Sequence, residues 1–231
     1  MSRAIPPNSL TLTREGILSD SIRALVQAAD PDVKLSTPEE RSASIRAMLA
    51  KRPDSGDVWL FAYGSLIWNP LIHFVEKRTG QVRGYHRRFC LWTRARGTVE
   101  QPGLVLALER GGCCHGVAFR IAEDSASHEL EVIWGREMLT GAYAPRWLQV
   151  KTAEGPLKAI GFVVNRTHRA YAGKLPDEHV IATIAGARGP LGACATYLFN
   201  TVARLEELGV RDHRLSQLRH HVAAKMDKSD A

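Results

Sequence analysis

From residue 58 onward, the sequence is a series of short apolar segments separated by glycine or proline. Segments with the composition of β-strands cover residues 58–63, 73–82, 85–93, 104–108, 116–121, 147–152 and 157–165. Glycine and proline are disfavoured inside strands and common in turns, so they mark the joints between these segments. Many short strands at close intervals are typical of a barrel or a strongly curled sheet. We therefore predict a small β-barrel.

Helical patterns lie before, within and after the strands. The predicted helices cover residues 14–28, a segment that begins at Thr37, and residues 127–139, 176–185 and 191–208. The second helix has the clearest start, because Thr37 and Glu40 form a capping box and Pro38 suits the first turn. Gly209 follows the last helix as a favoured terminating residue. The predicted fold class is α+β, a β-barrel flanked by helices.

A turn-forming segment at residues 52–56 separates the first two helices from the strands. We therefore predict a helical N-terminal extension over residues 1–56 and a main domain over residues 57–231. A chain of 231 residues buries about 70% of its unfolded surface on folding, so this core needs no disulfide or metal for stability.

The composition argues against several classes of protein. No stretch approaches eighteen consecutive apolar residues, and residues 1–7 lack the apolar run of a signal peptide, so we expect neither a membrane partner nor secretion. The four cysteines contain no C-x-x-C pair, which favours a reducing cytoplasm over a disulfide framework. Cys113 and Cys114 point to opposite faces if they lie in a strand, so they are poor co-ligands and we expect no metal site.

The excess of positive charge, +7 for the whole chain, is concentrated in one stretch. The acidic residue that opposes this charge is Glu76. The basic residues of the stretch are Lys77, Arg78, Arg83, Arg87, Arg88, Arg94 and Arg96. Such a cluster steers an acidic small molecule, binds phosphates, or simply forms the solvated face of alternating strands. We prefer the solvated face. No stacking platform or recognisable motif accompanies the cluster, so we expect no nucleic-acid partner.

Three segments contain residue types that suit chemistry. In the first, an apolar strand ends in Tyr63-Gly64-Ser65-Leu66, where glycine permits an open turn whose backbone N–H groups can bind a carboxylate or oxyanion. The second is Arg136-Glu137, since a carboxylate on a core-facing helix has a raised pKa and suits a base near neutral pH. The third is Gly189-Pro190-Leu191-Gly192, a predicted helix start able to hold an anion.

Each of these segments also has a plainer interpretation. The first can be an ordinary turn, the second an exposed glutamate paired with Arg136, and the third simple capping by Pro190. From spacing alone, the plainer interpretation is preferred in all three cases.

The order of these segments resembles one family. Residues 61–70, Phe-Ala-Tyr-Gly-Ser-Leu-Ile-Trp-Asn-Pro, are similar to the loop that cradles the γ-glutamyl group in ChaC-type γ-glutamylcyclotransferases. Further similarity lies at residues 84–89, 96–98, 101–108, 116–121, 134–138, 189–192, 197–198 and 205–212. The resemblance covers roughly residues 58–218 and leaves the first fifty or so residues outside it.

The resemblance implies a catalytic residue, because the glutamate of the family's Arg-Glu segment corresponds to Glu137. The residues that it implies for substrate binding are Leu60, Phe61, Ala62, Tyr63, Gly64, Ser65, Leu66 and Tyr143. A later tyrosine position of the wider superfamily holds Phe162 here, which removes one hydroxyl. Either Arg94 or Arg96 is a candidate for binding the carboxylate of the leaving group.

Members of this family convert glutathione into 5-oxoproline and cysteinylglycine. The resemblance therefore implies glutathione as the substrate, Glu137 as the base, and no metal or organic cofactor. Three alternatives stay open. They are a cyclotransferase for other γ-glutamyl amino acids or amines, a non-catalytic regulator that binds a ligand in the barrel, and a basic nucleic-acid binder. The oligomeric state is left open.

Overall fold

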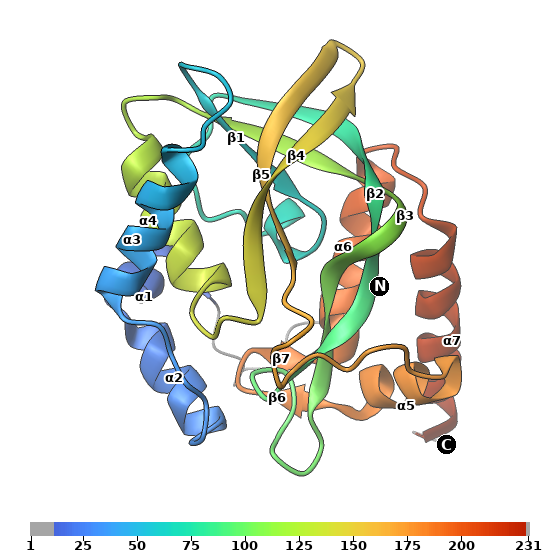
Figure 1. The fold of residues 1–231 in the computed structure, drawn as a ribbon. Coiled ribbons are helices and arrows are strands. Elements are labelled where there is room, and N and C mark those ends of the chain that lie inside the picture. Colours follow the sequence, from blue (N-terminus) through green and yellow to red (C-terminus); the bar gives the residue numbers. More distant parts are fainter. Residues whose placement is uncertain (1–11, 230–231) are drawn as a thin grey trace.

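The centre of the protein is a closed barrel of five strands, in the order β1-β3-β2-β4-β5 (Figure 1). The computed structural model describes residues 12–229, so residues 1–7, considered above for a signal peptide, lie outside it. The strands are β1 Val58–Ala62, β2 Glu76–Thr93, β3 Gly103–Ile121, β4 Tyr143–Thr152 and β5 Gly155–Val164. Most neighbours are antiparallel, and β5 also contacts β1 and β3 in parallel. The predicted barrel is confirmed.

Two strands are longer than the sequence pattern predicts. The pairs of segments expected at residues 73–82 with 85–93, and at 104–108 with 116–121, each form one continuous strand, β2 and β3. Gly84 adopts a φ of 84° where the register of β2 against β3 shifts, and Gly111 has a φ of 101° in β3. These glycines therefore bend the strands around the barrel instead of ending them, as bulges do.

Helices pack on both sides of the barrel (Figure 1). They are α1 Arg14–Leu18, α2 Ser21–Ala29, α3 Pro38–Leu49, α4 Ala126–Glu137, α5 Asp177–Gly186, α6 Cys194–Glu207 and α7 His213–Ser229. The capping box at Thr37 and the left-handed Gly209 are confirmed. The helix predicted at residues 14–28 is divided at Asp20, whose φ is 57°, and α7 was not predicted.

The third predicted segment does not begin a helix. Arg188–Gly189 (β6) and Gly192–Ala193 (β7) form a small hairpin, and α6 starts only afterwards. The backbone N–H of Leu191 donates to the carbonyl of Ala95 at 2.8 Å, and the Leu191 carbonyl accepts a hydrogen bond from Arg96 at 2.7 Å. These contacts commit the segment to the neighbouring loop, so the helix start expected there is wrong.

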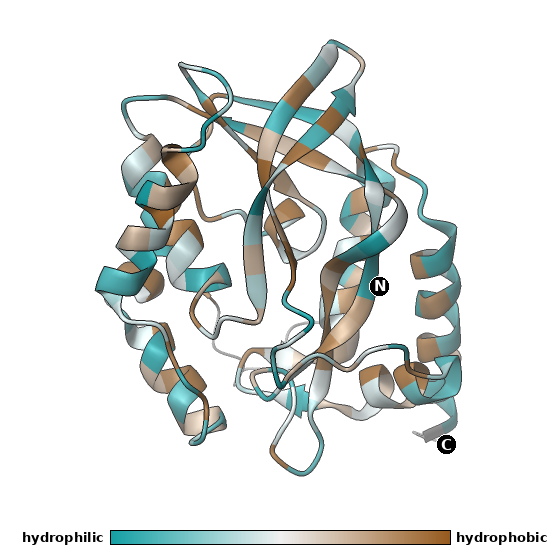
Figure 2. Cartoon of the chain, viewed as in Figure 1, coloured by the Kyte–Doolittle hydropathy of each residue, from teal (hydrophilic) through white to brown (hydrophobic). Residues whose placement is uncertain are grey.

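The hydrophobic core fills the barrel and extends beneath the helices. In Figure 2, hydrophilic and hydrophobic residues alternate at the turn end of the hairpin of β4 and β5, as expected where one face of a strand is more buried than the other, whereas residues 159–164 of β5 are buried throughout. The same alternation places Cys113 at the surface and Cys114 in the interior. Within residues 12–229, no helix is long and apolar enough to cross a membrane.

The basic stretch is not simply a solvated face. Several of its arginines form ion pairs, which join Arg78 to Glu76, Arg87 to Asp212, Arg88 to Glu109 and Arg94 to Asp30. Three of these carboxylates are distant in sequence, and the Arg87 side chain is almost completely buried. Tertiary pairing therefore neutralises much of a charge cluster that the sequence alone presents as unopposed.

Candidate active site

A cavity of about 770 Å³ lies between one end of the barrel, α6 and the N-terminal helices. Three of the residues predicted for the site, Ser65, Glu137 and Tyr143, line this cavity. They come from the loop after β1, the end of α4 and the start of β4, so the fold brings together residues that are far apart in the sequence.

Glu137 is the last residue of α4 and is held by its neighbour. Arg136 Nε lies 2.9 Å from Glu137 Oε1, and both side chains are largely buried. The same guanidinium donates to Ser65 Oγ at 2.7 Å and to the Asn69 carbonyl at 2.5 Å. Burial raises the pKa of Glu137, although the pairing with Arg136 opposes this effect. The geometry thus combines the two interpretations of this glutamate: it is paired with Arg136, and it is buried.

The first residues of the predicted binding segment support the loop from inside. The side chains of Leu60, Phe61 and Ala62 are completely buried in the barrel and do not line the cavity. The hydroxyl of Tyr63 donates to the Phe162 carbonyl at 2.7 Å. These residues therefore position the loop and make no direct contribution to the cavity wall.

At Gly64 the chain turns into a short 3₁₀ helix, Ser65–Ile67. A Cβ atom on Gly64 would lie 2.8 Å from the hydroxyl oxygen of Tyr197, so only glycine fits without displacing a neighbour. Leu66 is buried, and Ser65 is the member of the loop that reaches the cavity. The first N–H groups of a helix have no acceptor within it, so those of Ser65 and Leu66 are suited to bind an oxyanion.

Tyr143 and Phe162 occupy different environments. The hydroxyl of Tyr143 donates to the Leu106 carbonyl at 2.9 Å, and burial raises the pKa of this tyrosine well above 10. Phe162 is buried in the core, where its ring packs edge-on against Trp134 with centroids 5.3 Å apart. Of these two positions, only Tyr143 borders the cavity.

Two residues of the cavity could not be assigned from the sequence. Tyr197 was not predicted to belong to the site, and Arg96 could not be distinguished from Arg94. Tyr197 lies on α6, and burial raises its pKa to about 12. Its position on the apolar stripe of a helix was the signal for burial, but nothing local indicated that it meets Gly64. Arg96 lines the cavity with its guanidinium 5.1 Å from the centre of the Tyr197 ring, whereas Arg94 is paired with Asp30. The structure therefore distinguishes two arginines that the sequence left equivalent.

A model of the family described as ChaC-like protein matches residues 58–225, which is most of the chain. The chain belongs to the ChaC-like family. Among its relatives, a glutathione-specific gamma-glutamylcyclotransferase of Escherichia coli K12 is 42% identical over 90% of both chains. A human protein described as glutathione-specific gamma-glutamylcyclotransferase 1 is 34% identical, covering 63% of this chain and 68% of its own length.

Solved structures agree with the fold of this ChaC-like protein. The crystal structure of a γ-glutamylcyclotransferase specific to glutathione from yeast superposes with a TM-score of 0.68, covering 74% of this chain and 97% of that chain. The identity is only 20%, so this likeness concerns the fold alone. The segment before Val58 lies outside the family model, yet Leu12, Ile22 and Val26 from this segment line the cavity.

Proposed function

We propose that this protein is a glutathione-specific γ-glutamylcyclotransferase with Glu137 as its base. The observation that carries the proposal is a buried carboxylate with a raised pKa, in a cavity shared with Ser65 and Tyr143. Membership of the ChaC-like family and the printed activity of the E. coli relative support the choice of reaction and substrate.

The reaction needs mainly orientation and one proton transfer. The α-amine of the γ-glutamyl group attacks its own γ-carbonyl carbon, so a C–N bond forms and closes a five-membered lactam. The amide C–N bond to the cysteinyl nitrogen breaks. Because both reacting groups belong to one molecule, folding the substrate into the attack geometry supplies most of the acceleration, as in intramolecular reactions with effective molarities of roughly 10⁵–10⁸ M.

Glu137 supplies the proton transfer. About a tenth of an α-amine with a pKa near 8 is neutral at pH 7, so a base assists the attack. Glu137 takes the proton from the attacking amine and delivers it to the departing nitrogen, which leaves as the amine of cysteinylglycine. Such a transfer contributes typically 10²–10⁴-fold. Arg136 positions the carboxylate, because it binds Glu137, Ser65 and the backbone of Asn69 together.

Arg96 is the candidate for binding a carboxylate of the substrate. Partial burial in the cavity wall lowers the pKa of Arg96. Its guanidinium donates a hydrogen bond to a neutral carbonyl, that of Leu191, whereas Arg94 has Asp30 as an acidic partner. A substrate carboxylate in the cavity would compensate this charge with charge-assisted hydrogen bonds.

The proposal is tested by incubating the purified protein with glutathione and measuring 5-oxoproline and cysteinylglycine. We expect Glu137→Gln to lower kcat by about 10²–10⁴-fold with the fold retained, because the amide keeps the shape of the side chain but cannot accept the proton. Glu131→Gln is the matched control, since this glutamate lies on the same helix with an exposed side chain. Normal turnover by Glu137→Gln refutes the assignment.

The same assay separates the alternatives. Faster release of 5-oxoproline from γ-glutamyl-alanine than from glutathione identifies a cyclotransferase for other γ-glutamyl compounds. Binding of glutathione without any 5-oxoproline identifies a non-catalytic binding protein. A cytoplasmic location agrees with the proposal, because all four cysteines are free thiols, as expected in a reducing compartment.

A further inference from the structure

An apolar wall closes one side of the cavity, and it comes from the N-terminal segment. The wall consists of Leu12, Ile22 and Val26. Ile22 is almost completely buried and packs in one cluster with Leu139, which lies two residues after Glu137. The wall therefore stands beside the end of α4, where the proposed base is located.

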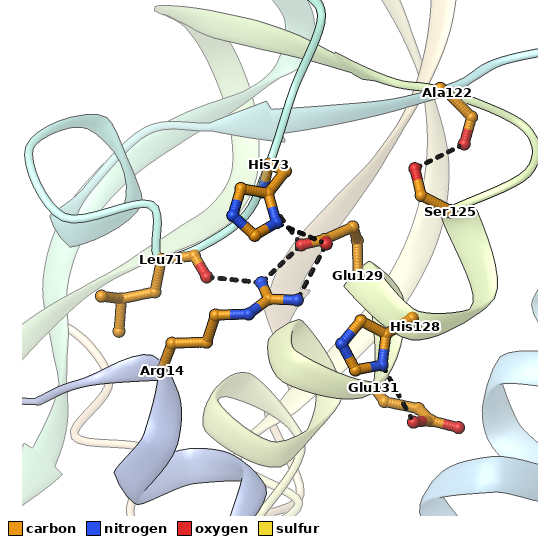
Figure 3. Close-up of polar contacts among 8 residues, drawn as sticks. All are labelled: Arg14, Leu71, His73, Ala122, Ser125, His128, Glu129 and Glu131. Atoms are coloured by element: carbon orange, nitrogen blue, oxygen red, sulfur yellow. Dashed lines mark hydrogen bonds and ion pairs between the residues drawn. The ribbon is translucent and has the colours of Figure 1, made fainter.

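The wall is tied to the main domain by a buried ion pair (Figure 3). Arg14 of α1 donates to both carboxylate oxygens of Glu129 on α4, at 2.6 and 2.8 Å, and also to the Leu71 carbonyl at 3.0 Å. His73 completes the cluster with its backbone N–H and its Nδ1, each 3.0 Å from Glu129. Arg14 follows Leu12 by two residues, so this pair restrains the start of the wall.

Further hydrogen bonds tie the same segment to residues around Glu137. Ser36 donates to the carbonyls of Met138 and Leu139, which directly follow the base, at 3.0 and 2.8 Å. Asn69 donates to the Leu12 carbonyl at 3.3 Å, and its own carbonyl accepts a hydrogen bond from Arg136. The wall and the base are thus held in one hydrogen-bonded frame.

The chemistry of the wall selects which part of a γ-glutamyl substrate it can contact. The γ-glutamyl half carries an amine and a carboxylate and must lie near Glu137, and the terminal carboxylate of the leaving dipeptide needs a cation such as Arg96. Placing any of these charged groups against three aliphatic side chains would remove it from water without giving it a partner, which is unfavourable. The side chain that remains is the cysteinyl CH₂SH, which behaves as a small hydrophobic group.

We propose that Leu12, Ile22 and Val26 form the pocket for the cysteinyl side chain, so that the N-terminal segment determines specificity for the residue after the γ-glutamyl group. This inference rests on the proposed function. It predicts that replacing the thiol by a hydroxyl, in γ-glutamyl-seryl-glycine, lowers kcat/KM by about 5- to 150-fold relative to glutathione, because the hydroxyl is buried without a partner.

The test compares these two substrates in an isosteric variant, Val26→Thr. A threonine hydroxyl in the wall gives the seryl hydroxyl a partner, so the preference for glutathione should fall at least about threefold while turnover of the γ-glutamyl group continues. Val75→Thr is the control, because Val75 is 59% exposed and does not line the cavity. In a second variant, Val26→Ala, S-methylglutathione should gain in kcat/KM relative to glutathione, since the wall then leaves room for a methyl group.

Unchanged selectivity in both variants, with activity retained, overturns the inference and leaves the proposed function intact. Absence of 5-oxoproline with the wild-type protein refutes the proposed function instead. In that case, calorimetry with the wild-type protein and with Val26→Thr measures the affinities for glutathione and for its seryl analogue. If the ratio of these two affinities is the same in both proteins, the inference about the wall is overturned.

Discussion

Replacing Arg14 by methionine tests how strongly the N-terminal helices are attached to α4 and the loop at Leu71. The substitution keeps an unbranched side chain that can still pack, but it removes the three hydrogen bonds that Arg14 donates to Glu129 and Leu71. Glu129, whose side chain is 2% exposed in the wild-type protein, then stays in place as a carboxylate without these partners. Only the two contacts with His73 remain to it.

The expected cost follows from the loss of one partner of a buried pair, which destabilises proteins by about 3–5 kcal/mol. Arg14 keeps some solvent contact, with a side chain 17% exposed, and His73 continues to bind Glu129, so we expect the lower end, about 3 kcal/mol. For a chain of this size, 1 kcal/mol shifts the melting temperature by about 2–4 °C, so the variant should melt roughly 6–12 °C lower at pH 7.

The pH dependence of this effect has a definite sign. Burial opposes the charge on Glu129, but the hydrogen bonds from Arg14 and His73 outweigh it and lower the pKa of this carboxyl. The contribution of the pair is therefore complete above the unfolded-state pKa of about 4.3, and it is lost as the pH falls through the folded-state pKa. The difference in melting temperature between wild type and Arg14→Met should shrink correspondingly below about pH 4.

Thermal unfolding followed by circular dichroism or calorimetry measures both effects. Arg204→Met is the matched control, because Arg204 pairs with Glu207 at the surface and such pairs contribute about 0–1 kcal/mol. The double variant Arg14→Met/Glu129→Gln should recover part of the loss, since no unpaired charge stays buried. The reasoning is refuted if Arg14→Met melts within 2 °C of wild type, or if the difference is as large at pH 3 as at pH 7.

Two further predictions concern the site itself. Burial raises the pKa of Glu137, and only the ionised carboxylate accepts a proton, so kcat/KM should decline on the acid side at a pH above 4.5. Arg136→Met removes the contact that lowers the pKa of Glu137, so the decline in kcat/KM should move to a still higher pH. An unchanged pH profile argues against the pairing of Arg136 with Glu137. Gly64→Ala places a Cβ atom 2.8 Å from the Tyr197 hydroxyl oxygen and should lower kcat/KM at least about tenfold by displacing the loop. Adding Tyr197→Phe should restore part of this loss, and a double variant as inactive as the single one contradicts the steric explanation.

Much of the fold was predictable because its signals are local. The capping box at Thr37 and the terminating Gly209 each depend on a few adjacent residues, and both are present in the structure. The alternation of strands predicted the opposite orientations of Cys113 and Cys114. Strand boundaries were less predictable, since a glycine such as Gly84 looks the same in sequence whether it ends a strand or bends one around a barrel.

Helix α7 shows the limit of periodicity. Its buried residues, Leu215 and Val222, are few and lie among charged and histidine side chains, so the segment lacks a clear apolar stripe. Its packing against α5 and α6 depends on tertiary contacts. The prediction of where α6 starts was wrong for a related reason. Contacts with the loop at Ala95 and Arg96 hold residues 188–193 as a hairpin.

The sequence by itself determined the barrel, because apolar spacing and the glycine and proline joints are contained in short segments. The loop after the first strand and the candidate base came from the order of the segments, which resembles one family, since spacing alone favoured the plainer interpretations. Only the tertiary structure decided which residues meet. It paired Arg94 with Asp30 and left Arg96 facing the cavity, and it placed Leu12, Ile22 and Val26 beside Glu137. The physical reason is that side chains pair and pack across the chain at separations that no local periodicity encodes, as Arg14 and Glu129 do across 115 residues.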